Sequence, residues 1–217
     1  MEYLVTMTTH VPSGTPDAEV ADVRAREGAH TRDLAAEGHV LRLWRPPLAP
    51  GEWRTIGLFA ADGPAELERV LASMPLRVWR TDEVTALSPH PNDPHFLPDS
   101  PRLSPGHDGA TEFLVTFTPA VPPGTPEKDV ADADAREAVR AGELAEQGHL
   151  VRLWKLPAPP ALGLWRADGD AEMRAILESL PLYPYVRTET TRLTPHPSDP
   201  AAPGSRSLRE PLGGPRG

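Results

Sequence analysis

The sequence predicts an α+β protein built from two copies of one small domain. The first observation is an internal repeat: residues 2–7 read EYLVTM, and residues 112–117 read EFLVTF. The second is a shared order of strand and helix patterns in the two copies. The third is a pair of Pro- and Ser-rich segments, one between the copies and one after them. Two such units fit a chain of 217 residues, because small domains commonly have about 100 residues.

The repeat extends through nearly all of both copies, in segments that keep their order and most of their residues. These segments pair 14–16 with 124–126, 38–45 with 148–155, and 90–94 with 196–200. The spacing between partners falls from 110 to 106 residues along the copy. A loop that lies between Arg45 and Gly57 in the first copy is therefore four residues shorter in the second.

The repeat defines the predicted domain boundaries. Copy one is assigned to residues 1–94 and copy two to residues 111–200. Residues 95–110 are rich in Pro, Ser, Asp and Gly and are predicted to be a linker. Residues 201–217 have a similar composition and are predicted to be a flexible tail.

Copy one illustrates the order of elements that both copies share. Residues 2–8 alternate in polarity and predict a strand. Thr15 and Pro16 fit an N-cap followed by proline at the first helical position. Gly38 is a typical signal after a helix end, so this helix is predicted to reach about Glu37. The remaining predictions are strands at 39–45 and 53–60, a helix at 64–73 capped by Asp62, and a last strand at 77–87.

The resulting order, βαββαβ, is the ferredoxin-like pattern. A sheet of this kind has helices on one face only, so its other face needs a cover that keeps apolar residues dry. The second copy can supply that cover within the same chain. We therefore expect the two sheets to pack against each other as an intramolecular dimeric α+β barrel.

Composition and missing motifs exclude several functions. The formal charge of −9 disfavours a nucleic-acid partner, because an acidic surface repels phosphate. The chain has no cysteine, which excludes disulfides, thiolate nucleophiles and iron–sulfur clusters. It also lacks GxGxxG, P-loop, HExxH and GxSxG motifs and any local metal-ligand spacing. We expect a protein that works without metal, nucleotide or flavin, and that is cytoplasmic with no membrane span.

One acidic side chain in each copy is predicted to face the core. On a helical wheel of about 100° per residue, Glu27 falls within an apolar stripe of the first helix, and Glu137 takes the same place in copy two. The stripes consist of Val20, Val23, Thr31 and Leu34, and of Val130, Ala133, Ala141 and Leu144. Burial raises the pKa of a carboxyl group, which suits a general acid or base. A structural ion pair, or a side chain that reaches solvent, is the alternative interpretation.

The second predicted strand of each copy contains an arginine among apolar residues. Arg42 and Arg152 each need a carboxylate, either the helix glutamate of the same copy or an acidic or enolate-bearing ligand. Strict alternation predicts that Val40, Arg42 and Trp44 share one face of the strand. The same strands contain Trp44 and Trp154, which are either core residues or a platform for a ligand.

Histidines supply further candidates for proton transfer. His39 and His149 begin the second strand of each copy and could shuttle protons, or could be exposed at the strand end. His10 and His30 have no partner in copy two and could mark copy one as the active copy. His90 and His196 are predicted to form structural turns after the last strands, with a smaller chance of lining a pocket.

The ordered series of these segments resembles the muconolactone Δ-isomerase family. Its members carry a glutamate in the first helix, then EG and LWR, then LPL before an aromatic-Pro-aromatic run, and finally HPS. The matching segments here are Glu37-Gly38, Leu43-Trp44-Arg45, Met74-Pro75-Leu76 and His90-Pro91 in copy one, and Gly148, Leu153-Trp154-Lys155, Leu180-Pro181-Leu182-Tyr183-Pro184-Tyr185 and His196-Pro197-Ser198 in copy two. Departures are the fusion of two copies, Arg77-Val78-Trp79 in copy one and Arg166 in copy two.

The resemblance implies an isomerase of the α+β barrel type that moves a double bond in a small unsaturated lactone without a cofactor. Glu27 and Glu137 match the family glutamate and would be the candidate bases, while Arg42 and Arg152 would stabilise an enolate. Two other functions stay open: a tailoring cyclase or cofactor-independent monooxygenase of aromatic natural products, and a non-catalytic module that binds a small aromatic ligand. The expected partner is a small-molecule substrate, and the expected state is a monomer or homodimer.

Overall fold

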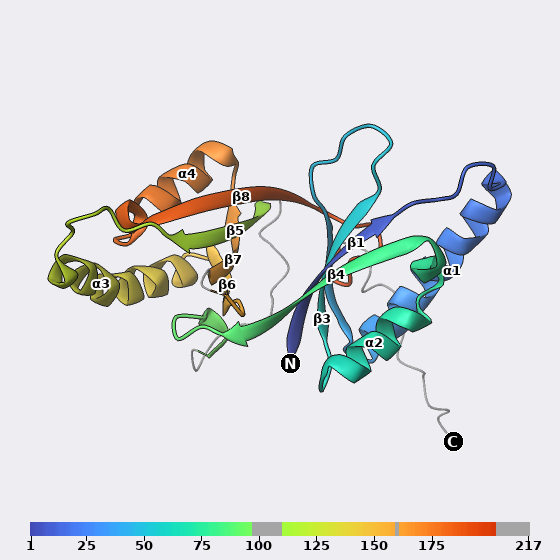
Figure 1. Cartoon of the computed structure of the whole chain (residues 1–217), viewed down its shortest axis with the longest axis horizontal. Helices are drawn as coiled ribbons and strands as arrows, with labels where there is room; N and C mark the ends of the chain where they lie inside the picture. Colours follow the sequence, from blue (N-terminus) through green and yellow to red (C-terminus); the bar gives the residue numbers. More distant parts are fainter. Residues whose placement is uncertain (97–109, 159–160, 203–217) are drawn as a thin grey trace, which may run out of the picture.

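A computed structural model describes residues 1–96, 110–158 and 161–202 of the chain. In Figure 1 the helices of the first repeat lie at one end of the molecule and those of the second repeat at the other, with the strands between them. The predicted linker at 95–110 and the predicted tail at 201–217 fall mostly outside the described residues.

The two repeats contain the same strands and α-helices in the same order, and short 3-10 helices are labelled η. Repeat 1 contains β1 (Glu2–Thr9), α1 (Asp17–Ala36), β2 (Val40–Arg45), β3 (Arg54–Ala60), α2 (Pro64–Ser73), η1 (Pro75–Trp79), β4 (Arg80–Pro89) and η2 (Pro94–Phe96). Repeat 2 contains β5 (Thr111–Pro119), α3 (Glu127–Glu146), β6 (Leu150–Lys155), β7 (Ala161–Ala167), α4 (Asp170–Glu178), η3 (Tyr183–Tyr185) and β8 (Val186–Pro195). This is the predicted βαββαβ order in each copy.

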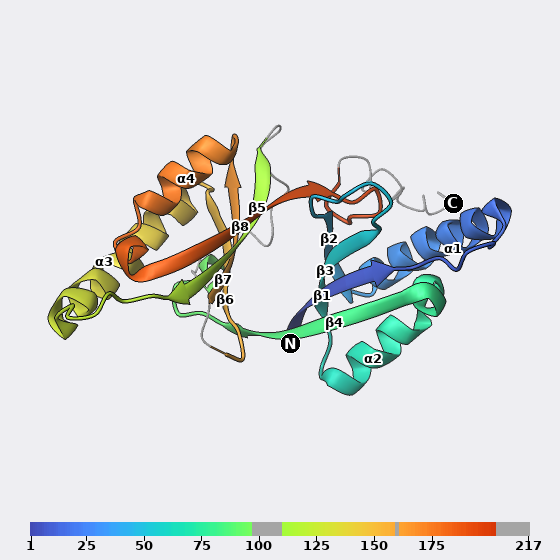
Figure 2. The ribbon, with the colours of Figure 1, turned by 45° about the horizontal axis from the view of Figure 1, so that its top comes forward.

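The eight strands close into one barrel in the order β1-β3-β2-β8-β5-β7-β6-β4. Two antiparallel junctions join the repeats, where β2 pairs with the end of β8 and β6 pairs with the end of β4. Figure 2 shows β4 and β8 as long strands that run from their own sheet toward the other repeat. Closure leaves neither sheet with a free edge. The predicted intramolecular dimeric α+β barrel is confirmed.

Apolar side chains fill three cores. One core lies between the first sheet and its helices, where Leu34 of α1 and Leu71 of α2 meet the strands, and repeat 2 has an equivalent core. The third core fills the barrel interior with strand residues from both repeats. Its most deeply buried members are Trp44, Leu58, Trp154 and Leu164. The shared interior core makes burial in each repeat depend on the other repeat.

A β-bulge changes the predicted alternation along β2. The pairing of β2 with β3 shifts between Val40 and Arg42, and a bulge inserts one extra residue into the strand. Val40 consequently joins Leu43 in the helix-side core, while Trp44 faces the barrel interior. The expectation that Val40 shares a face with Arg42 and Trp44 is wrong, because the bulge breaks the period of two.

Several predicted element ends are also displaced. Helix α1 has Pro16 rather than Thr15 as its N-cap, and α2 has Gly63 rather than Asp62, with no side-chain cap in either case. The Thr15 hydroxyl instead donates to the carbonyl of Pro12 at 2.8 Å. The last strand begins at Arg80 and not at residue 77, because η1 occupies the intervening residues.

Gly163 of β7 gives a test of packing in the core between the second sheet and its helices. A Cβ atom at this position would collide with the indole ring of Trp165, which is itself buried. We expect Gly163→Ala to lower the free energy of unfolding by about 1–3 kcal/mol, measured by urea denaturation. Gly142→Ala in α3 is the control, because nothing lies within 4 Å of its added Cβ and a helix favours alanine. Equal effects of the two substitutions would contradict this account of Gly163.

Candidate functional site

Each repeat has a cavity between its first helix and its sheet. The repeat 2 cavity has a volume of about 330 Å³ and is lined by residues that include His90, Glu137, Leu153, Lys155, Trp165 and Val186. The repeat 1 cavity has a volume of about 150 Å³ and is lined by residues that include Arg24, Glu27, Arg45, Trp53, Arg80 and His196. Both cavities therefore contain the glutamate that the helical periodicity singles out.

The cavities are built from both repeats. His90 and Asn92, which follow β4 of repeat 1, line the repeat 2 cavity. His196 and Ser198, which follow β8 of repeat 2, line the repeat 1 cavity. Each cavity is consequently incomplete without the other repeat. His90 and His196 lie in turns after the last strands, as predicted, and they also line a pocket, which was given the smaller chance.

Glu137 lies on the buried stripe of α3, between the buried Ala133 and Ala141. Its Oε2 accepts a hydrogen bond from the backbone N–H of Leu182 at 2.9 Å. Among the described residues no cation lies within ion-pair distance of this carboxylate, because Val186 occupies the place that Arg80 takes in repeat 1. Burial raises the pKa of Glu137 above its usual value, against the hydrogen bond from Leu182.

Glu27 has the same setting on α1 but gains a cation. Its Oε2 accepts a hydrogen bond from the backbone N–H of Leu76 at 2.8 Å, and its Oε1 accepts one from Nη1 of Arg80 at 3.3 Å. Arg80 also donates from Nε to Asp82 at 2.6 Å. Burial raises the pKa of Glu27, while Leu76 and Arg80 act in the opposite direction. The interpretation of this glutamate as a member of an ion pair therefore applies to repeat 1, with Arg80 as the partner.

The two cavity histidines are held as neutral hydrogen-bond donors. Nδ1 of His90 accepts the backbone N–H of Asn92, and Nδ1 of His196 accepts that of Ser198, each at 3.1 Å. A neutral ring with this contact carries its proton on Nε2. Burial lowers the pKa of His90, with Lys155 adding to the effect. Burial, Arg45 and Arg24 together lower the pKa of His196 to about 4.

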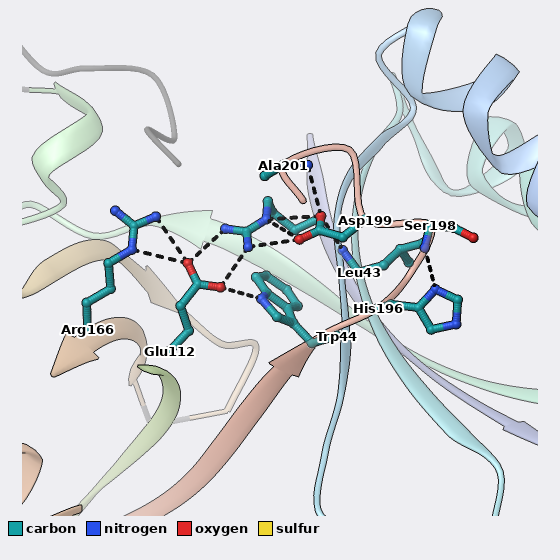
Figure 3. Close-up of polar contacts among 9 residues, drawn as sticks. Leu43, Trp44, Glu112, Arg166, His196, Ser198, Asp199 and Ala201 are labelled. Carbon is teal, nitrogen blue, oxygen red and sulfur yellow. Dashed lines mark hydrogen bonds and ion pairs between the residues drawn. The ribbon is translucent and has the colours of Figure 1, made fainter. Parts of the chain in front are cut away.

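An aspartate three residues after each histidine fixes the turn. Asp199 is fully buried, and its Oδ1 accepts the backbone N–H of Leu43 in β2 at 3.1 Å. The N–H of Asp199 in turn donates to the carbonyl of His196 at 2.8 Å. Figure 3 shows this aspartate between the backbone of Leu43 and the segment that contains His196. Asp93 makes the equivalent bonds to Leu153 and His90.

Arg42 and Trp44 belong to the same buried polar cluster and line neither cavity. Arg42 donates to Glu112 at 2.7 Å and to Asp199 at 3.0 Å, and Trp44 Nε1 donates to Glu112 at 2.6 Å. Burial alone would raise the pKa of Glu112, but the bonds from Arg42 and Trp44 hold it below its usual value. A pairing of Arg42 with Glu27 is wrong, because the bulged strand turns Arg42 into the barrel.

Repeat 2 has a matching cluster. Arg152 donates to Glu2 at 2.6 Å and pairs with Asp93 at 3.1 Å, and Trp154 Nε1 donates to Glu2 at 2.7 Å. The two arginines are thus satisfied by carboxylates of the other repeat. Arg166 adds a second cation at Glu112, and at the equivalent place in repeat 1 the residue is Ala60.

The remaining histidine candidates lie outside both cavities. Nδ1 of His39 contacts the carbonyl of Ala60 at 3.1 Å, and Nδ1 of His149 contacts that of Arg166 at 3.0 Å. These contacts fasten the start of β2 and of β6 to the adjacent strand. Nε2 of His30 contacts the Ser73 hydroxyl at 2.7 Å. His10, exposed, follows β1.

Sequence reasoning missed the residues that make the cavities unequal. Lys155 and Val186 line the repeat 2 cavity, and Arg24 and Arg80 line the repeat 1 cavity. The signal was present in the alignment of the two copies, which replaces Arg80 by Val186 and Arg24 by Asp134. Only the tertiary structure brings these positions and the glutamate of the same repeat to one cavity.

Two absences are reported for the described parts of the chain. In residues 1–96, 110–158 and 161–202, no group of three or more His, Asp or Glu side chains is arranged to hold a metal ion. Over the same ranges, no helix has the length and apolar character that a membrane span requires.

The closed barrel, with a half-buried glutamate between the first helix and the sheet of each repeat, places the chain in the class of dimeric α+β barrel proteins, with both halves in one polypeptide. A chlorite dismutase from Candidatus Nitrospira defluvii has the same fold, with a TM-score of 0.56 and 10% identity over 89% of this chain and 91% of that chain. The family model for muconolactone delta-isomerase matches residues 1–93 and 111–199. The chain therefore belongs to the muconolactone delta-isomerase family, as a tandem duplication.

Single-domain relatives align with one repeat. The muconolactone delta-isomerase of Cupriavidus pinatubonensis is 34% identical over 92 residues, which are 42% of this chain and 97% of that protein. Muconolactone delta-isomerase 2 of Acinetobacter lwoffii is 33% identical over 95 residues, which are 44% of this chain and 96% of that protein. With such relatives, the protein is an isomerase-type enzyme.

The buried clusters predict a large cost for the loss of one charge. Asp93→Asn leaves Arg152 short of a partner in a site where the aspartate is 1% exposed. We expect it to lower the free energy of unfolding by about 3–5 kcal/mol, measured by chemical denaturation. Asp22→Asn, which breaks the exposed pair with Arg26, should cost less than about 1 kcal/mol. Similar costs for the two variants would show that the buried pair is not structural.

The raised pKa of Glu137 predicts a pH-dependent effect on stability. When the pKa of a carboxyl group is higher in the folded than in the unfolded state, the protein becomes less stable as the pH rises through both values. Glu137→Gln removes this loss and keeps an acceptor for Leu182. The variant should therefore gain in Tm relative to the wild type at pH 8 more than at pH 4. Glu146→Gln, at an exposed position of α3, should show no such trend.

Proposed function

We propose that this protein is a cofactor-free isomerase that moves a double bond in a small unsaturated lactone, and that the repeat 2 cavity is its catalytic site. One observation carries the proposal: Glu137 stands in an apolar cavity with a raised pKa and no cationic partner among the described residues. A general base needs a pKa close to the working pH and access to the substrate. Glu137 lines the cavity, and burial shifts its pKa upward, the direction that suits a general base.

The proposed reaction is a proton transfer in two steps. Glu137 removes a proton from a carbon activated by the lactone carbonyl, and the electron pair moves through the double bond to the carbonyl oxygen, forming a dienolate. The carbonyl then forms again, the double bond takes its new position, and Glu137 returns the proton to the carbon next to the carbonyl. Atoms and electrons balance without an oxidant or a reductant.

Two side chains in the cavity suit the charge that develops. His90 supplies a neutral Nε2–H donor, and a positioned donor stabilises an enolate oxygen without exchanging its own proton. Lys155 is the only lysine or arginine among the residues that line the described cavity, and it suits an anionic group on the substrate. The walls, which include Phe117, Leu153 and Trp165, suit a small unsaturated ring.

Glu27 is less suited to the same task. Its ion pair with Arg80 stabilises the carboxylate and lowers its basicity. The repeat 1 cavity also has less than half the volume of the repeat 2 cavity, about 150 against 330 Å³. We therefore assign turnover to repeat 2, although the asymmetric histidines of copy one had suggested the opposite.

Matched substitutions test this assignment. With muconolactone as substrate, Glu137→Gln should reduce kcat by about 100- to 10,000-fold, because the amide cannot accept the proton. Glu27→Gln should keep most of the turnover. Turnover can be followed by the loss of the ultraviolet absorbance of the conjugated substrate, and incorporation of solvent deuterium by NMR would report the proton transfer.

Other results would favour the alternatives. Turnover that survives both substitutions would exclude catalysis by either glutamate, and ligand binding without any turnover would favour a binding module. Oxygen uptake with a quinol would favour a cofactor-independent monooxygenase. A loss of activity in Glu27→Gln alone would move the catalytic site to repeat 1.

A further inference from the structure

The repeat 1 cavity differs from the repeat 2 cavity in the sign of its charge. Three arginines and one glutamate line the repeat 1 cavity, whereas one lysine and two carboxylates, Glu137 and Asp134, line the repeat 2 cavity. Since Arg80 is already engaged by Glu27 and Asp82, the excess positive charge resides on Arg24 and Arg45. A cavity with this charge attracts anions.

Arg24 and Arg45 have no carboxylate partner in the described part of the chain. Arg24 instead stacks over Trp53, with its guanidinium carbon 5.1 Å from the ring centroid. Both arginines act on His196, which shares the cavity, because both contribute to the low pKa of that ring. Two guanidinium groups that converge on one cavity without an acid between them are suited to bind a carboxylate.

Neutral donors and an aromatic wall complete the cavity. His196 carries its proton on Nε2, as its Nδ1 accepts the N–H of Ser198. In Figure 3 His196 and Ser198 lie next to each other on the segment that follows β8, close to Leu43. Trp53 comes from the longer loop of copy one, and the corresponding residues 156–160 of copy two contain no tryptophan. The contribution of Trp53 to a cavity wall is therefore specific to repeat 1.

The size of the cavity limits its ligand. A cavity of roughly 150 Å³ holds a molecule about as large as benzene. The repeat 1 cavity has about this volume, and Arg24 and Arg45 are among its lining residues. A single ring with one carboxylate fits both the volume and the charge.

We propose that the repeat 1 cavity is a second, non-catalytic binding site for a small monocyclic carboxylate of about the size of benzoate. Arg24 and Arg45 bind the carboxylate, Trp53 covers the ring, and His196 donates a hydrogen bond. The site is separate from the catalytic activity assigned to repeat 2, and its occupancy does not depend on that activity.

Calorimetric titration with benzoate at low salt tests the proposal, with benzamide as the neutral ligand of the same shape. We expect one benzoate per chain and at least about tenfold weaker binding of benzamide, because benzamide has no charge for the arginines. Arg45→Gln and Arg24→Gln should each weaken benzoate binding by about tenfold. Lys155→Gln, at the position that corresponds to Arg45 in repeat 2, should leave it unchanged. Thermal unfolding of each variant confirms that it is folded.

Three results would overturn the proposal. The first is no binding of benzoate up to about 10 mM. The second is equal affinity for benzoate and benzamide. The third is weaker binding in Lys155→Gln but not in the arginine variants, which would place the anion in the repeat 2 cavity. Since benzoate binding is measured without turnover, none of these results depends on whether Glu137 is the catalytic base.

Discussion

The structure depends on one constraint: an arginine buried in each half of the barrel is neutralised only by carboxylates of the other half. Arg42 meets Glu112 and Asp199, and Arg152 meets Glu2 and Asp93. A buried charge without a partner is costly, so the two repeats are stable only when they are correctly paired. Fusion into one chain keeps the partner repeat always available.

The same constraint positions the candidate site. The aspartate that binds each buried arginine also closes the turn that carries the cavity histidine. The hydrogen bonds that hold the barrel together therefore also fix His90 beside the repeat 2 cavity and His196 beside the repeat 1 cavity. Because each cavity has its own lining residues, the residues of one cavity can change while the barrel and its buried ion pairs stay the same.

Duplication has made the two cavities chemically different. Exchange of Arg80 for Val186 leaves Glu137 without the ion pair that holds Glu27, and it gives the repeat 2 cavity a more apolar wall. The repeat 1 cavity contains three arginines and Trp53, which follows a longer loop. The same barrel thus contains a larger apolar cavity with Glu137 in repeat 2 and a smaller, positively charged cavity in repeat 1.

The sequence by itself determined the repeat, the order of elements and the position of Glu27 and Glu137 on a buried helical stripe, because periodicity and repetition are local properties of the chain. Only the tertiary structure decided the partners of Arg42, which lie 70 and 157 residues away, and the entry of His90 and His196 into the cavity of the opposite repeat. A β-bulge, which no alternation rule contains, also changed the face on which Val40 lies. Such contacts depend on barrel closure, which brings together residues whose separation along the chain gives no sign of their proximity.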